Sequence, residues 1–398
     1  MDKAFLILAD GTVFEGTSIG ATGKNIGETV FTTGMTGYLE TLTDPSYYGQ
    51  IVTQTFPLIG NYGTIPEDYE SKKSWVRGYI VREICDLPSN FRCGGTLNDF
   101  LKAQSIIGIC GIDTRALTKR LRESGVMNGM IVSGIDACPA VTDALLKEIK
   151  DYKIEQAVET VSIKKGGRLP LITDEVVASP STGSGTATTP SSITPSSGGH
   201  PRNAPALHVV LWDFGAKANI QRELEKRGCS VTVVPCTTTA DEILALNPDG
   251  LMLSNGPGDP AENVGIIKEI KKICDTGKLP IFGICLGHQM LALARGCKTS
   301  KLKYGHRGGN HPCKDTKTDR VYITSQNHGY AVESESLPEY AKMSFFNVND
   351  GTVEGITYTD IPAFSVQFHP EACGGPHDTN FLFDEFLKMM EGKHAIKS

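Results

Sequence analysis

Short apolar runs alternate with amphipathic stretches along the second half of the chain. Runs of strand length at Leu207 to Trp212 and Gly250 to Leu253 are each followed by helical spacing, at Ala216 to Arg227 and Val264 to Cys274. The same pattern predicts strands at Cys229 to Pro235 and Leu279 to Ile284 and a helix at Ala240 to Leu246. This alternation predicts an α/β fold with a doubly wound, mostly parallel sheet. Ligands in such sheets bind at the carboxyl ends of the strands.

The first half of the chain has many strand signals and fewer helical ones. An apolar run at Ala4 to Ala9, then Asp10 and Gly11, then a second run near Val13, predicts a β-hairpin. Further strands are expected at Val30 to Thr33, Ile51 to Phe56 and Val76 to Ile84, and helices at Leu97 to Ala103 and Asp113 to Ser124. We therefore expect a mixed α/β domain.

Between these halves the composition changes. Ser179 to His200 consists almost entirely of Ser, Thr, Gly and Pro, which cannot bury a core. The 398 residues are enough for two domains. We predict an N-terminal mixed α/β domain over residues 1–152, a linker with the Ser/Thr/Gly/Pro-rich insertion over 153–205, a second domain over 206–392 and a tail over 393–398.

Composition narrows the function classes. The net charge of -6 argues against a nucleic-acid partner, which would require a basic face. No apolar stretch approaches the roughly 20 residues that span a bilayer, and the start lacks the pattern of a signal peptide. The eleven cysteines form no C-x-x-C pair, which favours a reducing, cytoplasmic location. His306, His311 and Cys313 cluster, but a fourth ligand is missing, so no metal is expected.

The segment from Pro280 to Gln289 carries the clearest chemical signal. A buried strand leads directly into Gly-x-Cys-x-Gly, centred on Cys285, and then into a helix. This is the cysteine counterpart of a nucleophile elbow, a strained turn whose glycines avoid collisions with the neighbouring strand and helix. A lone cysteine is more often a small buried hydrophobe. Here the helix N-terminus favours the thiolate, so the pattern predicts that Cys285 is a nucleophile.

A thiol nucleophile needs a base and a group that orients the base. His369 and Glu371 follow an alternating strand and flank Pro370. A histidine in a surface loop is the commoner case, but together with the elbow these residues predict a catalytic triad. The Gly/Pro-rich loop from Ser254 to Pro260 is either a simple turn or a source of amide groups that, with the amide of Leu286, stabilise an oxyanion. No Lys-Ser or Lys-Thr follows its glycines, which disfavours phosphate binding.

Taken together, these motifs resemble those of class I glutamine amidotransferases, which convert glutamine to glutamate and ammonia through a γ-glutamyl thioester. The N-terminal half, in turn, is similar to the carbamoyl-phosphate synthase small-subunit family. The similarity covers nearly the whole chain apart from the Ser/Thr/Pro-rich stretch. The segments that carry both resemblances are Leu8 to Gly11, Phe14 to Gly16, Gly34 to Glu40, Thr43 to Tyr47, Ser254 to Pro260, Gly283 to Gln289, Tyr304 to His306, Gly308 to Pro312, Gln326 to Tyr330 and His369 to Glu371.

The resemblance implies a role for each matching residue. Cys285 is the expected nucleophile, His369 the general base and then acid, and Glu371 the group that orients His369. Gly256 and Leu286 are the expected oxyanion donors. The residues implied to hold glutamine are Ser46, Gly256, Gly258, Leu286, Gln289, Asn327, Gly329 and Tyr330. The family further implies that this chain has no cofactor and that its partner is a large synthetase chain, which uses ATP, Mg and bicarbonate.

Two other functions stay open. A non-catalytic scaffold or regulatory role would be indicated by loss of the nucleophile, but Cys285, His369 and Glu371 are all present. An amidotransferase for another acceptor, such as chorismate or a purine nucleotide, is opposed by the N-terminal half, which those enzymes do not resemble. The sequence does not indicate whether the product would serve arginine or pyrimidine synthesis.

Overall fold

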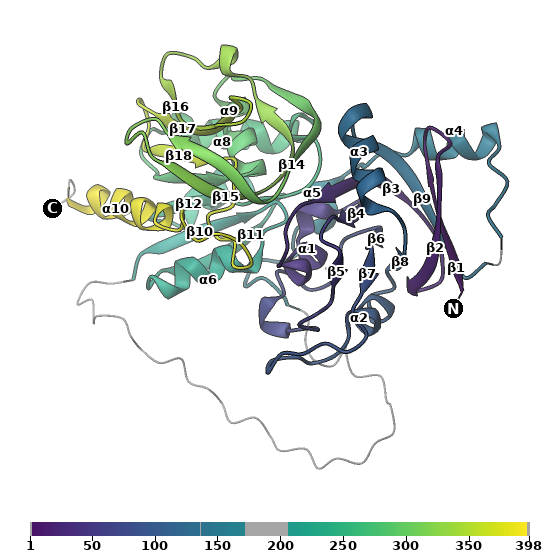
Figure 1. The fold of residues 1–398 in the computed structure, drawn as a ribbon. Coiled ribbons are helices and arrows are strands. Elements are labelled where there is room, and N and C mark those ends of the chain that lie inside the picture. Colours follow the sequence, from purple (N-terminus) through teal and green to yellow (C-terminus); the bar gives the residue numbers. More distant parts are fainter. Residues whose placement is uncertain (1, 136, 172–205, 396–398) are drawn as a thin grey trace.

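The N-terminal domain is built around a closed β-barrel (Figure 1). The structure, a computed structural model, describes residues 2–135, 137–171 and 206–395. Around the barrel the strand order is β1-β2-β8-β6-β4-β3-β9. The expected hairpin is confirmed, because β1 and β2 pair antiparallel with Ala4 opposite Gly16 and Ile7 opposite Val13. The barrel strands are β1 (Lys3–Leu8), β2 (Val13–Gly20), β3 (Gly23–Thr32), β4 (Gln50–Gln54), β6 (Gly78–Ile80), β8 (Ile107–Cys110) and β9 (Met127–Ser133).

Short helices and turns complete this domain. The helix expected at Leu97 to Ala103 is α2, whose first turn is capped by the Thr96 hydroxyl accepting from the Asp99 amide. The prediction of one strand from Val76 to Ile84 is wrong in its length. The structure has two short strands there, because β6 ends at Ile80 and β7 is a separate strand. The remaining elements are α1 (Tyr38–Thr43), η1 (Pro45–Tyr47), β5 (Leu58–Ile59), η2 (Pro66–Asp68), β7 (Glu83–Ile84), α2 (Leu97–Ala103), α3 (Thr114–Ser124), α4 (Asp143–Asp151) and α5 (Ala157–Val161).

The second domain contains the expected doubly wound sheet. Its strand order is β11-β10-β12-β13-β18-β17-β16-β14-β15. The neighbours from β11 to β18 pair in parallel, and those from β18 to β15 pair antiparallel. The strands are β10 (His208–Asp213), β11 (Ser230–Pro235), β12 (Gly250–Leu253), β13 (Ile281–Ile284), β14 (Thr299–Asp315), β15 (Val321–Val332), β16 (Ala341–Asn347), β17 (Val353–Tyr358) and β18 (Ala363–Val366).

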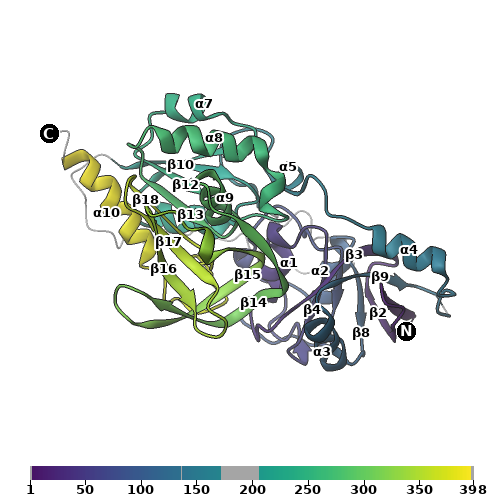
Figure 2. The same ribbon diagram turned by 90° about the horizontal axis from the view of Figure 1, so that it is seen from above.

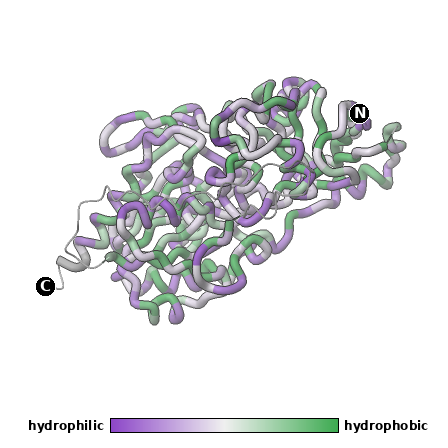
Figure 3. The backbone as a smooth tube through the Cα atoms, turned by 90° about the horizontal axis from the view of Figure 1, so that it is seen from below, coloured by the Kyte–Doolittle hydropathy of each residue, from purple (hydrophilic) through white to green (hydrophobic). Residues whose placement is uncertain are grey.

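Helices cover both faces of this sheet. Ile270 and Ile273 of α8 and Met290 of α9 pack into a core on one face, and Ile220 of α6 and Phe383 of α10 pack into a core on the other. Figure 3 shows hydrophobic stretches alternating with hydrophilic ones along the chain in both domains, as this layered packing requires. The helices are α6 (Ala218–Lys226), α7 (Ala240–Ala245), η4 (Pro260–Glu262), α8 (Val264–Asp275), α9 (Leu286–Ala294), η5 (Ser334–Ser336) and α10 (Leu382–Ala395).

The expected domain limits stay predictions. Within the expected linker, α5 buries Val158 and Val161, and Gly167 pairs with Val233 of the edge strand β11. The Ser/Thr/Gly/Pro-rich segment lies outside the described residues. Helix α10 continues to residue 395, past the expected limit at 392. Of the helices in the described ranges, none has both the length and the apolar character required to cross a bilayer.

The two domains meet at the carboxyl ends of the parallel strands. Strand β14 contacts β3 and α3 of the N-terminal domain, as Figure 2 shows. There Thr33 donates its amide and hydroxyl hydrogens to the carbonyl oxygen of Arg307, at 3.3 and 3.2 Å. Further contacts at this boundary join Lys301 to Glu28, at 2.8 Å. Asn255, two residues after the parallel strand β12, donates to the Ser46 hydroxyl at 2.9 Å, so the N-terminal domain covers the edge of the sheet where ligands are expected.

Candidate active site

Cys285 lies at the turn between β13 and α9. Its backbone φ of 53° and ψ of -103° are unusual for a residue other than glycine, as expected for a strained elbow. A Cβ on Gly287 would lie 2.4 Å from the carbonyl oxygen of Leu253, and one on Gly283 would lie 3.0 Å from the Gly287 backbone. The predicted need for both glycines is confirmed. The turn is tied to the sheet by the Cys285 amide, which donates to Val366 at 2.9 Å.

His369 and Glu371 follow β18, the strand next to β13. The His369 amide donates to the Ser325 carbonyl at 2.9 Å, and its Nδ1 lies 2.7 Å from Glu371 Oε1. A carboxylate on Nδ1 fixes the proton there and leaves Nε2 for the nucleophile. Nε2 has no hydrogen-bond partner among the described residues. Both side chains are almost completely buried, so their charges interact strongly.

The charges of the neighbours determine the protonation of this pair. Burial and the Lys217 ammonium lower the pKa of His369, but Glu371 and the contact with the Cys285 thiol outweigh them and raise it to about 9. Burial alone would raise the pKa of Glu371, whereas Lys217 and His369 lower it to about 2. The structure thus brings Cys285, His369 and Glu371 together, with an ionised carboxylate beside the imidazole.

Lys217 is a site residue that the sequence analysis missed. Its Nζ lies 2.6 Å from Glu371 Oε1, the same oxygen that contacts His369, and the side chain is buried. Lys217 directly precedes α6, in the turn after β10. A lysine at the carboxyl end of a parallel strand was the available signal. Its charge keeps the Glu371 carboxylate ionised.

A cavity of about 370 Å³ opens at Cys285, between the two domains. Charged groups of both signs line it, including the basic Arg307 and Lys301 and the acidic Glu28, Asp259 and Glu262. Leu286 does not line this cavity and is the first residue of α9. The other residues predicted to hold glutamine line it together: Ser46, Gly256, Gly258, Gln289, Asn327, Gly329 and Tyr330.

The N-terminal domain contributes directly to this cavity. The Asp44 carboxylate accepts from the Ser46 amide at 2.8 Å and from Asn327 Nδ2 at 3.3 Å. Asn255, in the predicted oxyanion loop, donates to the Ser46 hydroxyl at 2.9 Å. Asp44 and Asn255 were not among the predicted site residues. They connect Ser46 to the two segments of the second domain that face Cys285.

The backbone around the predicted oxyanion donors is tightly packed. A Cβ on Gly256 would lie 2.2 Å from the Phe214 carbonyl oxygen and 2.8 Å from the Leu286 side chain, so only glycine fits. The Gln289 amide group donates to the Tyr330 carbonyl at 2.7 Å and to Gln367 at 2.9 Å. Gly256 and Leu286 are thus neighbours beside Cys285, and Gln289 is held against the strand that carries Tyr330.

A second cavity, of about 470 Å³, lies on the other side of the triad. His369 and Lys217 line it, whereas Cys285 lines the first cavity. Cys373, in the Ala-Cys-Gly-Gly segment after Glu371, also lines it and lies 3.7 Å from Glu70 Oε1. Burial and the nearby carboxylates raise the pKa of the Cys373 thiol, which keeps it protonated.

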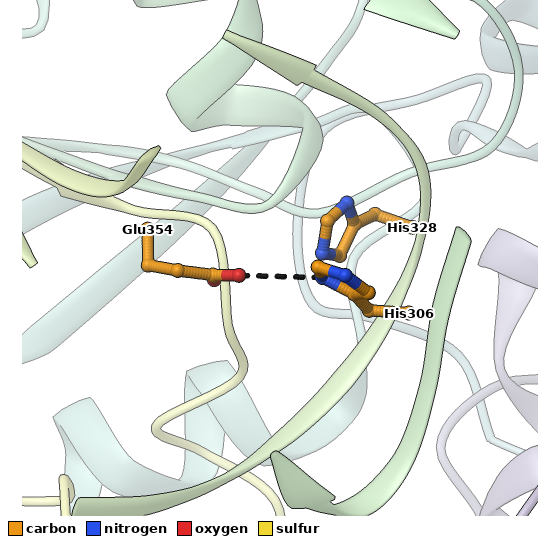
Figure 4. A group of neighbouring side chains, drawn as sticks. All are labelled: His306, His328 and Glu354. Carbon is orange, nitrogen blue, oxygen red and sulfur yellow. Dashed lines mark ion pairs between the residues drawn. The ribbon is translucent and has the colours of Figure 1, made fainter. Parts of the chain in front are cut away.

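The histidine-rich segment is arranged differently from the cluster that the sequence suggested. His306, His328 and Glu354 offer ligand atoms within 4.8 Å of one another (Figure 4), whereas Cys313 bonds to Thr324. Burial lowers the pKa of His306, but Asp350 at 2.8 Å and Glu354 at 3.4 Å raise it to about 9. His306 thus forms ion pairs with Asp350 and Glu354.

Two family models match separate parts of this chain. Residues 210–389 match the family model "Glutamine amidotransferase class-I", and residues 6–131 match "Carbamoyl-phosphate synthase small chain, CPSase domain". A solved structure from Thermoplasma acidophilum, described as that of a putative GMP synthase component, is 23% identical, covering 49% of this chain and 98% of its own, with a TM-score of 0.44.

Curated relatives match over nearly their whole length. The carbamoyl phosphate synthase small chain of Bacillus anthracis is 50% identical over 98% of this chain and 96% of its own. The small chain of Clostridium perfringens is 49% identical over 97% and 99%, and that of Symbiobacterium thermophilum is 45% identical over 96% and 98%. Because the identity is high and extends through both domains, this chain belongs to the carbamoyl phosphate synthase small chain family.

Proposed function

We propose that this chain is the glutamine-hydrolysing component of a carbamoyl phosphate synthase. It releases ammonia from glutamine at Cys285 and passes the ammonia to a large synthetase chain. That partner makes carbamoyl phosphate from bicarbonate and ATP, with Mg. One observation carries the proposal: the Cys285 thiol lines a cavity with charges of both signs, and the His369 ring, which Glu371 holds at 2.7 Å, lies beside that thiol.

In the first half of the reaction, His369 takes the thiol proton and Cys285 Sγ attacks the side-chain amide carbon of glutamine. The carbonyl oxygen becomes an oxyanion, for which the amides of Gly256 and Leu286 are the proposed donors. His369 then gives its proton to the departing nitrogen. The C–N bond breaks, and ammonia and a γ-glutamyl thioester form.

In the second half, a water molecule replaces ammonia beside His369. His369 removes a proton from the water, which attacks the thioester carbon, and the C–S bond breaks. Glutamate leaves and the Cys285 thiol is restored with the proton held by His369. Glu371 keeps its negative charge throughout, because Lys217 and His369 lower its pKa to about 2. It orients the ring and stabilises the imidazolium.

The first cavity has the right chemistry for a free amino acid. Glutamine carries an ammonium and a carboxylate on its α carbon, and the cavity walls include both Arg307 and the acidic Glu28 and Asp259. We propose Ser46, Gly256, Gly258, Leu286, Gln289, Asn327, Gly329 and Tyr330 as the residues that hold the substrate. We further propose that ammonia leaves on the side of His369, through the second cavity.

The proposed location is the cytoplasm. All eleven cysteines lie in the described part of the chain and are free thiols, which suits a reducing compartment. The proposed partner supplies the ATP, Mg and bicarbonate chemistry, and the small chain itself is proposed to use no cofactor.

The proposal is tested with the Cys285→Ala variant assembled with the large chain. Carbamoyl phosphate formation from glutamine should fall to background, whereas formation from added ammonia should stay at the wild-type rate. Cys297→Ala is the matched control, because Cys297 is also buried and lies just after α9. Its glutamine-dependent rate should stay within about twofold of wild type, as expected for a substitution away from the reacting atoms.

Each contrary result points to a different function. Unchanged glutamine-dependent synthesis in Cys285→Ala would favour the non-catalytic scaffold. Glutamate release without carbamoyl phosphate formation in the assembled wild type would favour another acceptor for the ammonia. A radiolabelled thioester trapped on the wild type, and absent from Cys285→Ala, would identify the covalent intermediate directly.

A further inference from the structure

Arg307 places a buried guanidinium in the wall of the glutamine cavity. It belongs to β14, is 5% exposed, and lines the same cavity as Cys285. Its side chain donates a hydrogen bond from Nη1 to the Tyr304 carbonyl oxygen, at 2.7 Å. Within the described ranges its Nε has no hydrogen-bond partner. A guanidinium has five donor hydrogens, so this side chain keeps hydrogen-bonding capacity for a ligand.

No acidic side chain of the described residues forms an ion pair with this guanidinium. Among the acidic side chains, Glu28 is the one whose charge acts on the pKa of Arg307. Its carboxylate, however, is already bound by Lys301 at 2.8 Å and by Gln50 at 3.0 Å. Burial is the largest influence on Arg307 and lowers its pKa. A buried cation without a carboxylate is unfavourable, and proteins usually provide such a group with a partner. An anionic ligand would supply it.

Two glycines make room for the guanidinium beside the substrate strand. A Cβ on Gly305 would lie 2.6 Å from Nη1 of Arg307, and a Cβ on Gly329 would lie 3.4 Å from its Nη2. Gly329 is one of the residues proposed to hold glutamine, and it lines the cavity with its neighbour Tyr330. The guanidinium therefore lies against the strand segment that faces the substrate, and not in a separate part of the core.

We propose that Arg307 is a further substrate-binding residue, which pairs with the α-carboxylate of glutamine. The inference rests on the proposed glutaminase function and adds to it the group that selects a free amino acid. A guanidinium binds a carboxylate through two parallel hydrogen bonds, which fix orientation as well as position. The acidic Asp259 and Glu262 in the same cavity suit the substrate's α-ammonium group. A glutamine whose carboxyl group is blocked should bind poorly.

The main experiment compares L-glutamine with L-glutamine α-amide, which has no carboxylate, in the complex with the large chain. The wild type should have a KM for the amide about 10- to 150-fold higher, the range expected for losing a charged hydrogen bond. Arg307→Met should raise KM for glutamine by a similar factor with kcat within about threefold. The KM of Arg307→Met for the α-amide should equal that of the wild type, so this variant should no longer distinguish glutamine from its α-amide. Arg307→Lys, which keeps the charge without the fork, should be intermediate.

Two readouts separate binding from a structural role. In a Cys285→Ala background, L-glutamine should raise Tm, and Arg307→Met should abolish this rise without lowering the Tm of the unliganded protein. Lys303→Met is the matched control, because it removes an exposed cation from the same strand outside the cavity. If Arg307→Met does not fold, the wild type's preference for glutamine over its α-amide still tests the proposal.

Several results would overturn the inference. The first is equal KM values for glutamine and its α-amide in the wild type. The second is an Arg307→Met variant whose KM rises by the same factor for both substrates. The third is an Arg307→Met variant in which kcat falls and KM is unchanged. A lower Tm of unliganded Arg307→Met would assign the residue a structural role. Failure of the underlying function looks different, because the wild type itself would then release no glutamate. An active wild type with an unaffected Arg307→Met variant refutes only the role of Arg307.

Discussion

Replacing Lys217 by methionine should shift the pH profile of glutamine hydrolysis toward higher pH. The side chain of Lys217 is buried and its Nζ contacts Glu371 Oε1, beside His369 Nδ1 on the same oxygen. The positive charge lowers the pKa of His369. Without this charge, the ring holds its proton more tightly. Methionine keeps the length of the apolar stem and removes only the ammonium group.

The size of the effect follows from the geometry. The two contacts with Glu371, at 2.6 and 2.7 Å, place the ammonium within about 5 Å of the ring, where unit charges interact by about 3 kcal/mol at an effective dielectric constant of ~20. Because about 1.4 kcal/mol is a factor of about ten in a protonation equilibrium, half of this energy moves the profile by about one pH unit. The glutaminase rate on the acidic limb should then fall about tenfold.

The assay is kcat/KM for glutamine between pH 6 and pH 10 in the complex with the large chain. The whole profile is compared, because interacting groups in the site release their protons together, and no single limb is assigned to one residue. Lys226→Met is the matched control, because Lys226 is the last residue of α6 and its side chain is 74% exposed. Its profile should coincide with that of the wild type.

An unchanged profile in Lys217→Met, or a shift to lower pH, would refute this reasoning. Loss of stability alone would not reproduce the expected result. Removing one partner of a buried ion pair costs about 3–5 kcal/mol, so a lower Tm is expected in addition. A merely unstable variant would lose activity at every pH by a similar factor, whereas a charge effect is largest on the acidic limb.

Two further predictions concern the elbow and the stability of the triad. Gly287→Ala should destabilise the fold by about 1–3 kcal/mol in urea unfolding, because its Cβ would lie 2.4 Å from the Leu253 carbonyl oxygen. The control is Gly265→Ala in α8, whose Cβ would meet nothing within 4 Å. This substitution should be neutral or stabilising in the same measurement. The pKa of His369 rises from 6.5 to about 9 on folding. The ion pair of His369 therefore contributes stability that is complete below about pH 6.5 and is lost as the pH rises through 9. The Tm difference between wild type and His369→Gln should shrink over this pH range. A Tm difference that stays constant would contradict the raised pKa of His369.

The proximity of Cys285, His369 and Glu371 could be predicted because the signals for it are local. Gly283, Cys285 and Gly287 must lie at alternate positions to make the elbow, and His369 must closely follow a strand to lie beside it. For Lys217 the position after a parallel strand is the one local signal, and it does not indicate what the ammonium contacts, whereas Arg307 has no local signal. Their proposed roles depend on contacts with segments far away in the sequence. A single buried cation therefore cannot be recognised from the sequence before the fold shows its neighbours.

The strands β14 and β15 show why part of the fold could not be predicted. The sequence of β14 is polar and glycine-rich, without the alternation that marks a half-buried strand. Its buried positions carry His306 and Arg307, whose burial depends on hydrogen bonds and charges supplied by other residues. Closure of the N-terminal barrel could not be predicted either, because it depends on the pairing of β1 with β9 from the far end of the domain.

The cavity proposed to bind glutamine is lined by residues of both domains, which would give the N-terminal domain a part in the proposed chemistry. Asp44 binds the Ser46 amide and reaches Asn327, whose carbonyl lies 3.6 Å from Cys285 Sγ. Glu70, in the same domain, accepts from the Asn219 amide at 2.9 Å, two residues after Lys217. Both sides of the triad are therefore attached to the N-terminal domain. A partner chain that moved this domain by a fraction of an ångström would change the alignment of Cys285 with His369, because buried polar contacts of this kind tolerate little displacement.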